Sequence, residues 1–151
     1  MDGFSAPESP PESRTRHALT GRVMHVIGRA NVVDAQYRLY RDDWGILSHT
    51  VELAYSRDLT KQWSLRLRAR GYHQNHAAFY QETYAMPMRF MTVDRELSTF
   101  YDGMTGIKLG YAGERWDLDA KVDAIVYRFE DYARLRGRVA VVSGLGVTWR
   151  W

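Results

Sequence analysis

The side chains with the most evident chemistry are charged residues that recur at every second position. Arg66, Arg68 and Arg70 alternate with Leu and Ala residues. A period of two places all three guanidinium groups on one face of an extended strand. Burying an unpaired charge is costly, so these groups need water, carboxylates or both. We therefore expect a charged surface with acids on the neighbouring strands.

Other segments carry charges with the same period, and we expect them to share that face. The residues assigned to it are Asp34, Arg38, Glu52, Arg66, Arg68, Arg70, Asp94, Glu96, Asp102, Lys108, Asp117, Asp119, Lys121 and Asp123. Two interpretations stay open. The charges tune the selectivity of a pore for ions or solutes, or they form a salt-bridge network that fills a narrow interior and conducts nothing.

The corner Arg41-Asp42-Asp43-Trp44 offers paired carboxylates that suit a divalent cation. Two adjacent acids supply too few ligands for calcium, which takes six to eight oxygens. The favoured interpretation is a solvated loop held by Arg41 and Trp44. We expect this corner to mark a position in the fold and to bind no metal.

Two other groups of residues invite a metal or catalytic interpretation. His73 and His76 lie three apart with Glu82 nearby, but this spacing binds zinc well on a helix and we expect a loop here. Ser48 and His49 are adjacent on a strand, so they point to opposite faces and cannot form a hydrolase pair. We predict no catalytic residue, no metal, no cofactor and no enzymatic activity.

Composition narrows the class of protein. The 151 residues suit about one domain, and no apolar run is long enough for a transmembrane helix. Only three of the 21 basic residues are lysines, but the 18 arginines alternate with acids, so we expect no nucleic-acid partner. The absence of cysteine fits a cytosolic protein or a bacterial envelope protein.

The start of the chain differs from the rest. Residues 1–15 hold three of the four prolines and lack the charged and apolar regions of a signal peptide, so we expect a disordered or loop lead-in. We expect residues 16–151 to form a β-barrel segment, on the grounds of its strand faces and connections. It consists of about seven alternating strands, and the fifth runs from about Met91 to Ala112. Connections alternate between short (28–31, 56–62, 113–115) and long (41–46, 73–88, 130–137).

Each strand has an apolar face and a polar face, and the question is which face lies inside. A soluble barrel turns the apolar face inward, whereas a transmembrane barrel turns it to lipid and joins short periplasmic turns to long outer loops. The apolar face mixes small residues with leucine, which suits lipid better than a packed core. Aromatic residues gather at strand ends, as in a membrane girdle: Tyr55, Trp63, Tyr111, Trp116, Trp149 and Trp151. We predict an antiparallel outer-membrane β-barrel; a soluble barrel is the alternative.

The alternation of short and long connections indicates in which direction each strand crosses the membrane. If the short turns are periplasmic, the seventh strand runs inward and so does the first. Bacterial barrels have an even number of strands with both ends in the periplasm. Seven strands are therefore part of a larger barrel, and we expect missing N-terminal strands or other copies to close it.

Several motifs resemble a bacterial family catalogued as domain of unknown function 3570. They are Tyr37-Arg38-Leu39-Tyr40-Arg41-Asp42-Asp43-Trp44-Gly45-Ile46-Leu47-Ser48-His49-Thr50, Arg70-Gly71-Tyr72-His73-Gln74, Ala77-Ala78-Phe79-Tyr80 and Asp94-Arg95-Glu96-Leu97-Ser98. Gly71 stands where the family usually has tyrosine. The resemblance covers residues 16–151. It implies an outer-membrane barrel, whose apolar face contacts lipid, but no established activity. Separately, the outer-loop arginines Arg134, Arg136 and Arg138 are expected either to contact lipopolysaccharide phosphates or to be solvated. Trp151 resembles the terminal aromatic recognised by the barrel-assembly machinery.

The sequence thus predicts an outer-membrane barrel that acts as a pore or transport barrel with a charged lumen. The alternative is a structural or accessory barrel whose outer loops bind a surface partner or glycan. An enzyme of the outer-membrane protease or lipase kind ranks last, because no catalytic triad is evident.

Overall fold

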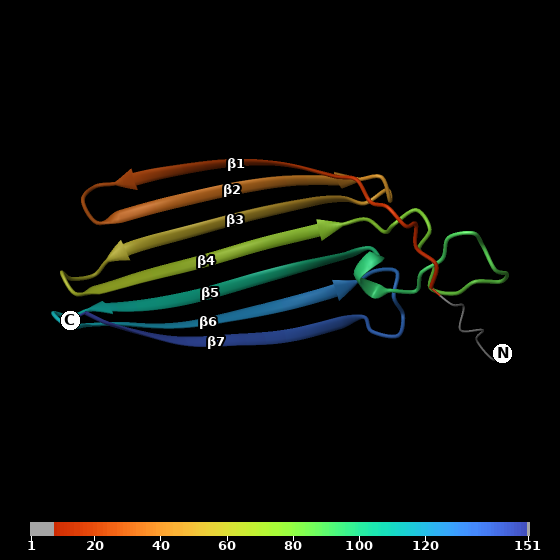
Figure 1. Cartoon of the computed structure of the whole chain (residues 1–151). Helices are drawn as coiled ribbons and strands as arrows, with labels where there is room; N and C mark the ends of the chain where they lie inside the picture. Colours follow the sequence, from red (N-terminus) through yellow and green to blue (C-terminus); the bar gives the residue numbers. More distant parts are fainter. Residues whose placement is uncertain (1–7, 151) are drawn as a thin grey trace.

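The chain folds into one antiparallel sheet of seven strands in a computed structural model that describes residues 8–150 (Figure 1). The strands are β1 (Arg16–Ile27), β2 (Asn31–Asp42), β3 (Leu47–Asp58), β4 (Trp63–Gln74), β5 (Phe100–Ala112), β6 (Trp116–Phe129) and β7 (Gly137–Trp149). Each strand pairs with its neighbours in sequence. The predicted all-β antiparallel fold is confirmed. Residues 1–7 of the predicted lead-in, and Trp151 with its predicted assembly role, lie outside the described residues.

The sheet is open rather than closed into a barrel. Its order runs from β1 to β7, and among residues 8–150 these two edge strands pair only with β2 and β6. The part of the chain that the structure describes contains a three-residue 3-10 turn, η1 (Arg95–Leu97), and no α-helix. No helix within this part is long and apolar enough to cross a membrane.

The predicted alternation in length holds for the later connections, but the predicted long connection between β2 and β3 has only four residues, as many as the short turn between β3 and β4. Short turns at 28–30, 59–62 and 113–115 lie at one end of the sheet, and the connections at 43–46, 75–99 and 130–136 lie at the other (Figure 1). Gly28 in the first short turn has φ 65°, a left-handed conformation that costs other residues energy. The ends are named here the turn end and the loop end.

The predicted start of the fifth strand is wrong. Met91 pairs instead with Ser9 through two backbone hydrogen bonds of 2.9 and 3.1 Å. The Asp94 side chain then accepts a hydrogen bond from the Glu96 backbone and caps η1. These local bonds hold the backbone out of the sheet until Phe100. Asp94 and Glu96 consequently lie in the β4–β5 loop rather than on a strand.

In a soluble sheet the apolar face is buried and the charged face is exposed to water, whereas here the charged face is the more buried of the two. Acids on the charged face are buried: Asp34 is 8% exposed, Asp102 5% and Asp123 8%. The apolar face is open, with Val23 70% exposed and Leu145 88%. Charged groups therefore gather on the sheltered side of the sheet, and aliphatic groups form its outside.

Small residues make room for charges on the sheltered side. The register places Arg68, Gly106 and Asp123 in one row on β4, β5 and β6. The Arg68 Nη2 reaches Asp123 Oδ1 at 3.4 Å across the intervening glycine. A Cβ atom at Gly106 would overlap Asp123 Oδ1. Glycine at this position thus permits an ion pair between strands that are not adjacent.

We predict that Gly106→Val lowers the free energy of unfolding by about 1–3 kcal/mol, because the added side chain displaces Asp123 from Arg68. Gly103→Val is the matched control, since nothing lies within 4 Å of its Cβ position on the apolar face of the same strand. Urea midpoints followed by tryptophan fluorescence compare the two. Equal stability of the two variants would contradict the steric argument.

Candidate functional site

Charged residues from most of the strands form cross-strand ion pairs on the charged face. Arg22 and Arg66 approach Asp34 at 2.5 and 3.8 Å, and Arg70 lies 2.8 Å from Asp102. Further pairs join Arg68 to Asp123, Lys108 to Asp119 and Arg150 to Asp117. Most of the predicted lining residues therefore neutralise one another. Among the charges assigned by sequence, only Asp94 and Glu96 fall outside the strands.

Arg38 and Glu52 differ from most of the other residues assigned to this face. Both lie on it by alternation, Arg38 opposite Thr50 and Glu52 opposite Arg70. Within residues 8–150 neither side chain makes an ion pair of 4.0 Å or less. Lys121 on β6 likewise makes none within this range, so these three side chains of the charged face remain available to another molecule.

The predicted solvated corner is in fact built around a buried carboxylate. The Asp42 side chain is fully shielded and accepts hydrogen bonds from Arg14 at 2.8 and 2.6 Å, from the Tyr40 hydroxyl at 2.8 Å and from the Ile46 backbone at 2.9 Å. All these donors satisfy one charge, as burial requires. The prediction of a solvated loop tied down by Arg41 is wrong, because Arg14 is the cation that pairs here.

The same corner holds the segment that precedes β1. The Trp44 indole donates to the Ser13 carbonyl at 2.9 Å, and the Asp43 carboxylate accepts from the Thr15 backbone at 3.0 Å. The Arg14 guanidinium lies 4.3 Å from the centre of the Trp44 ring, a cation–π contact. Arg41 remains exposed. The motif therefore fastens residues 13–15 to the corner.

The histidines singled out by sequence do not form a metal centre. His73 lies on the apolar face of β4, whereas His76 lies beyond the strand and contacts Thr99 and Asp131, each at 3.1 Å. Among residues 8–150, no group of three or more His, Asp or Glu residues is placed to hold an ion.

The long loops pack against each other and against the corner. Ile46, Ala77 and Tyr80 form a buried apolar cluster, and the Tyr80 hydroxyl donates to the Asp131 carbonyl at 2.8 Å. Burial raises the pKa of Tyr80 to about 12. Hydrogen bonds from Thr99 and then His76 lower the pKa of the Asp131 carboxyl below its usual value. The 75–99 and 130–136 loops thus form one ordered structure at the loop end.

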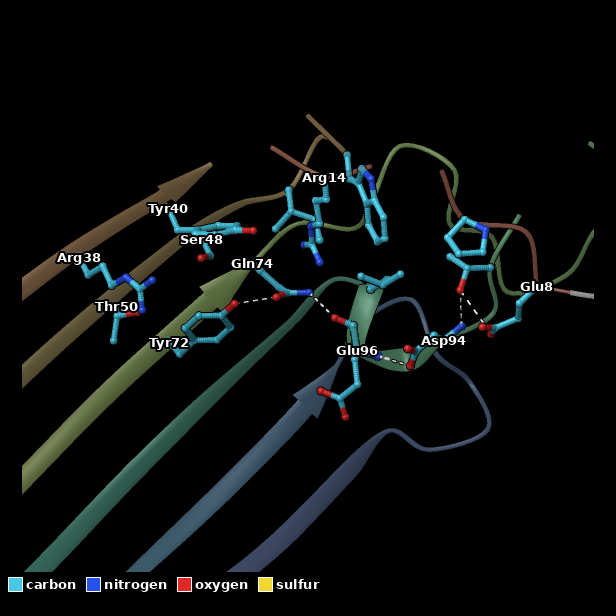
Figure 2. Close-up of a pocket in the computed structure, with 15 residues that line it drawn as sticks. Glu8, Arg14, Arg38, Tyr40, Ser48, Thr50, Tyr72, Gln74, Asp94 and Glu96 are labelled. Atoms are coloured by element: carbon cyan, nitrogen blue, oxygen red, sulfur yellow. Dashed lines mark hydrogen bonds between the residues drawn. The ribbon is translucent and has the colours of Figure 1, made fainter. Parts of the chain in front are cut away.

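A cavity of about 540 Å³ lies between these loops and the charged face (Figure 2). β2, β3 and β4 form one wall, with Arg38, Thr50 and Tyr72. The opposite wall consists of the pre-β1 segment and the β4–β5 loop, with Glu8, Asp94 and Glu96. Sequence reasoning missed this cavity, because its lining residues come from several separate segments spread between Glu8 and Leu97.

We predict that Asp42→Ala destabilises the protein by about 3 kcal/mol, since it leaves Arg14 and several buried donors without an acceptor. Asp43→Ala is the control: its exposed carboxylate contacts only the Thr15 backbone among the described residues, and the cost should stay below about 1 kcal/mol. Urea unfolding of the two variants measures the difference, and a smaller effect at position 42 than at 43 would overturn this assignment.

Comparison with known proteins supports the resemblance seen in the sequence motifs. A family model described as "Protein of unknown function (DUF3570)" matches residues 3–146. The search of curated proteins found no match. Because the family match covers nearly all of the sequence, from the pre-β1 segment to β7, this chain belongs to the DUF3570 family.

Proposed function

We propose that the protein is an outer-membrane β-barrel whose charged face lines the lumen and whose apolar face contacts lipid. The observation that carries this proposal is the burial of the two faces. Asp102 is 5% exposed on one side, and Leu145 is 88% exposed on the other. Such a sheet is unfavourable in water, because its aliphatic side chains stay exposed to solvent and contribute no hydrophobic stabilisation. Lipid chains on the apolar face remove this cost.

The length of the apolar face matches a bilayer. On β4 this face extends from Trp63 to His73, which is about 33 Å along the strand at about 3.3 Å per residue. Barrel strands tilt by about 40°, so the height across the membrane is about 25 Å, the height of the apolar band in outer-membrane barrels.

Aromatic residues border this apolar face at the turn end. Trp63 and Tyr111 pack with their ring centres 5.0 Å apart, and Trp116 and Trp149 pack at 4.0 Å. At the loop end, Tyr101 lies on the same face near the start of β5, opposite His73 of β4. Amphipathic rings at both borders correspond to the girdles at the two membrane interfaces.

The register also supports tilted strands. Asn31 belongs to the last residue pair between β1 and β2, next to their turn. When the register is followed across β3 and β4, the residue on β5 that lies level with Asn31 is Leu109. β5 continues beyond Leu109 to Ala112, and the last pair of β6 and β7 is Trp116–Trp149. The turns thus step progressively along the strand direction. A barrel with its turns level at one membrane surface requires this stagger.

Closure of the barrel requires additional strands. β1 and β7 run in the same direction, so they cannot form an antiparallel pair with each other (Figure 1). We propose that strands from outside residues 8–150, or from other copies, occupy the two sheet edges. We further propose that three exposed arginines, Arg134 and Arg136 in the β6–β7 loop and Arg138 near the start of β7, contact lipopolysaccharide phosphates.

The lumen has the features of a passage for small polar solutes. β4 presents three arginines and β6 presents Asp117, Asp119 and Asp123, so basic and acidic strands lie on either side of β5. The Arg68–Asp123 pair that joins these two strands is 3.4 Å long and only partly buried. The Arg66–Asp34 and Lys108–Asp119 pairs of the same face are 3.8 and 3.4 Å long and also partly exposed, which leaves the charges able to interact with passing ions. The proposed role is a pore or transport barrel with a charged lumen.

A second candidate is an accessory barrel that binds a partner or glycan through its loops. The packing of Tyr80 against Ile46 and Ala77 favours it, because an ordered surface loses less entropy on binding than a flexible one. In this case the ion-pair network fills the lumen and no current passes.

Planar-bilayer recording distinguishes the two candidates. We predict single-channel conductance, with Arg68→Ala raising the preference for cations several-fold, because it leaves Asp123 without its partner in the lumen. The reversal potential in a KCl gradient measures this shift. Arg57→Ala, on the apolar face of β3, should leave it unchanged. No conductance over repeated insertions would contradict the pore and favour the accessory barrel.

A further inference from the structure

The cavity beneath the loops has walls of opposite charge (Figure 2). Arg14 and Arg38 are its basic lining residues, and Arg14 is engaged by the buried Asp42. Arg38 makes no ion pair within residues 8–150, although it lies among polar groups of the sheet. The sheet wall therefore presents one available guanidinium group.

Polar neighbours prepare the surroundings of Arg38 for an anionic group. Thr50 lies directly opposite Arg38 on β3, and Tyr72 lies opposite Thr50 on β4. These three residues also line an adjoining cavity of about 330 Å³ on the charged face. The guanidinium is thus reachable, and the Thr50 hydroxyl accompanies it. A carboxylate is a suitable partner for such a fork of N–H donors.

The opposite wall presents acids. The Glu96 side chain is 65% exposed, and its contact with Arg95 is 3.4 Å long and open to solvent. Glu8 accepts a hydrogen bond of 3.4 Å from Thr92, and Asp94 uses Oδ1 to cap η1. Several carboxylate oxygens therefore remain able to accept hydrogen bonds from a cationic group.

A buried amide holds the two walls in place. Gln74 is 5% exposed and accepts a hydrogen bond from the Tyr72 hydroxyl at 2.6 Å (Figure 2). Its Nε2 donates to the carbonyls of Glu96 and Ser98 at 2.9 and 3.0 Å. This bridge fixes the acidic loop against the end of β4. A cavity with fixed walls loses little entropy when a ligand enters.

We propose that this cavity binds a small zwitterionic solute of the amino-acid or short-peptide class. Its carboxylate pairs with Arg38, and its ammonium group lies among Glu8, Asp94 and Glu96. The volume of about 540 Å³ suits a molecule of this size, since small-ligand sites commonly span about 300–1,000 Å³. The site depends only on the walls described above and goes beyond the proposed pore, because binding requires no conductance.

Three peptides test the two ends of the proposed ligand separately. Calorimetric titration of the purified full-length protein uses diglycine, N-acetyldiglycine and diglycinamide, which carry both charges, only the anion and only the cation. We expect diglycine to bind about tenfold more tightly than either blocked peptide, since each loses one charge-assisted hydrogen-bonded contact. No binding of diglycine, or equal binding of all three peptides, would overturn the proposal.

Variants assign each charge to its wall. Arg38→Gln should weaken diglycine about tenfold and abolish the difference between diglycine and diglycinamide. Glu96→Gln should instead reduce the difference between diglycine and N-acetyldiglycine. Arg41→Gln, an exposed position on the other face of β2, should leave the affinity unchanged. Unchanged diglycine affinity in Arg38→Gln contradicts the proposal. If that variant does not fold, the comparison of the three peptides on the unaltered protein still tests the proposal.

Discussion

Buried charge needs a partner, and this requirement organises the sheltered face of the sheet. An arginine side chain spans more than the distance between adjacent strands, so Arg66 reaches Asp34 from β4 to β2 and Arg68 reaches Asp123 from β4 to β6. The crossing from Arg68 to Asp123 needs a small residue on the strand between them, and Gly106 provides it. The register position, the size and the charge of the residues on this face are therefore coupled. A change in any one of them leaves a charge without its partner.

The same requirement orders the loop end. Asp42 gathers donors from the pre-β1 segment, β2 and the corner, and Gln74 joins β4 to the backbone around η1. Each group is buried and hydrogen-bonded, which makes its position well defined. These two polar residues help to form the cavity, because they hold Arg14 and the acidic loop on either side of it. Order in the loops thus follows from satisfied polar groups as well as from the small cluster around Ala77.

Alternation in the sequence was enough to predict seven antiparallel strands and the face on which Arg66 or Asp117 lies, because strand periodicity is a local property. The start of β5 was not predictable in this way. The Asp94 cap and the pairing of Met91 with Ser9 override an alternating pattern that continues upstream of Phe100. The Arg14–Asp42 pair joins residues 28 positions apart, so no local signal identifies it. Asp94 and Glu96 were assigned to a lumen strand, whereas the fold places them opposite Arg38 across a cavity.

The central claim is that the apolar face of this sheet contacts lipid while the charged face lines an aqueous interior. Since the sequence contains no cysteine, single cysteines placed along β4 report on each face separately. In the membrane-embedded protein, a water-soluble maleimide should label Ser64→Cys and Arg66→Cys and leave Leu67→Cys and Ala69→Cys unmodified. Labelling with the opposite alternation, or equal labelling at all four positions, would contradict the account.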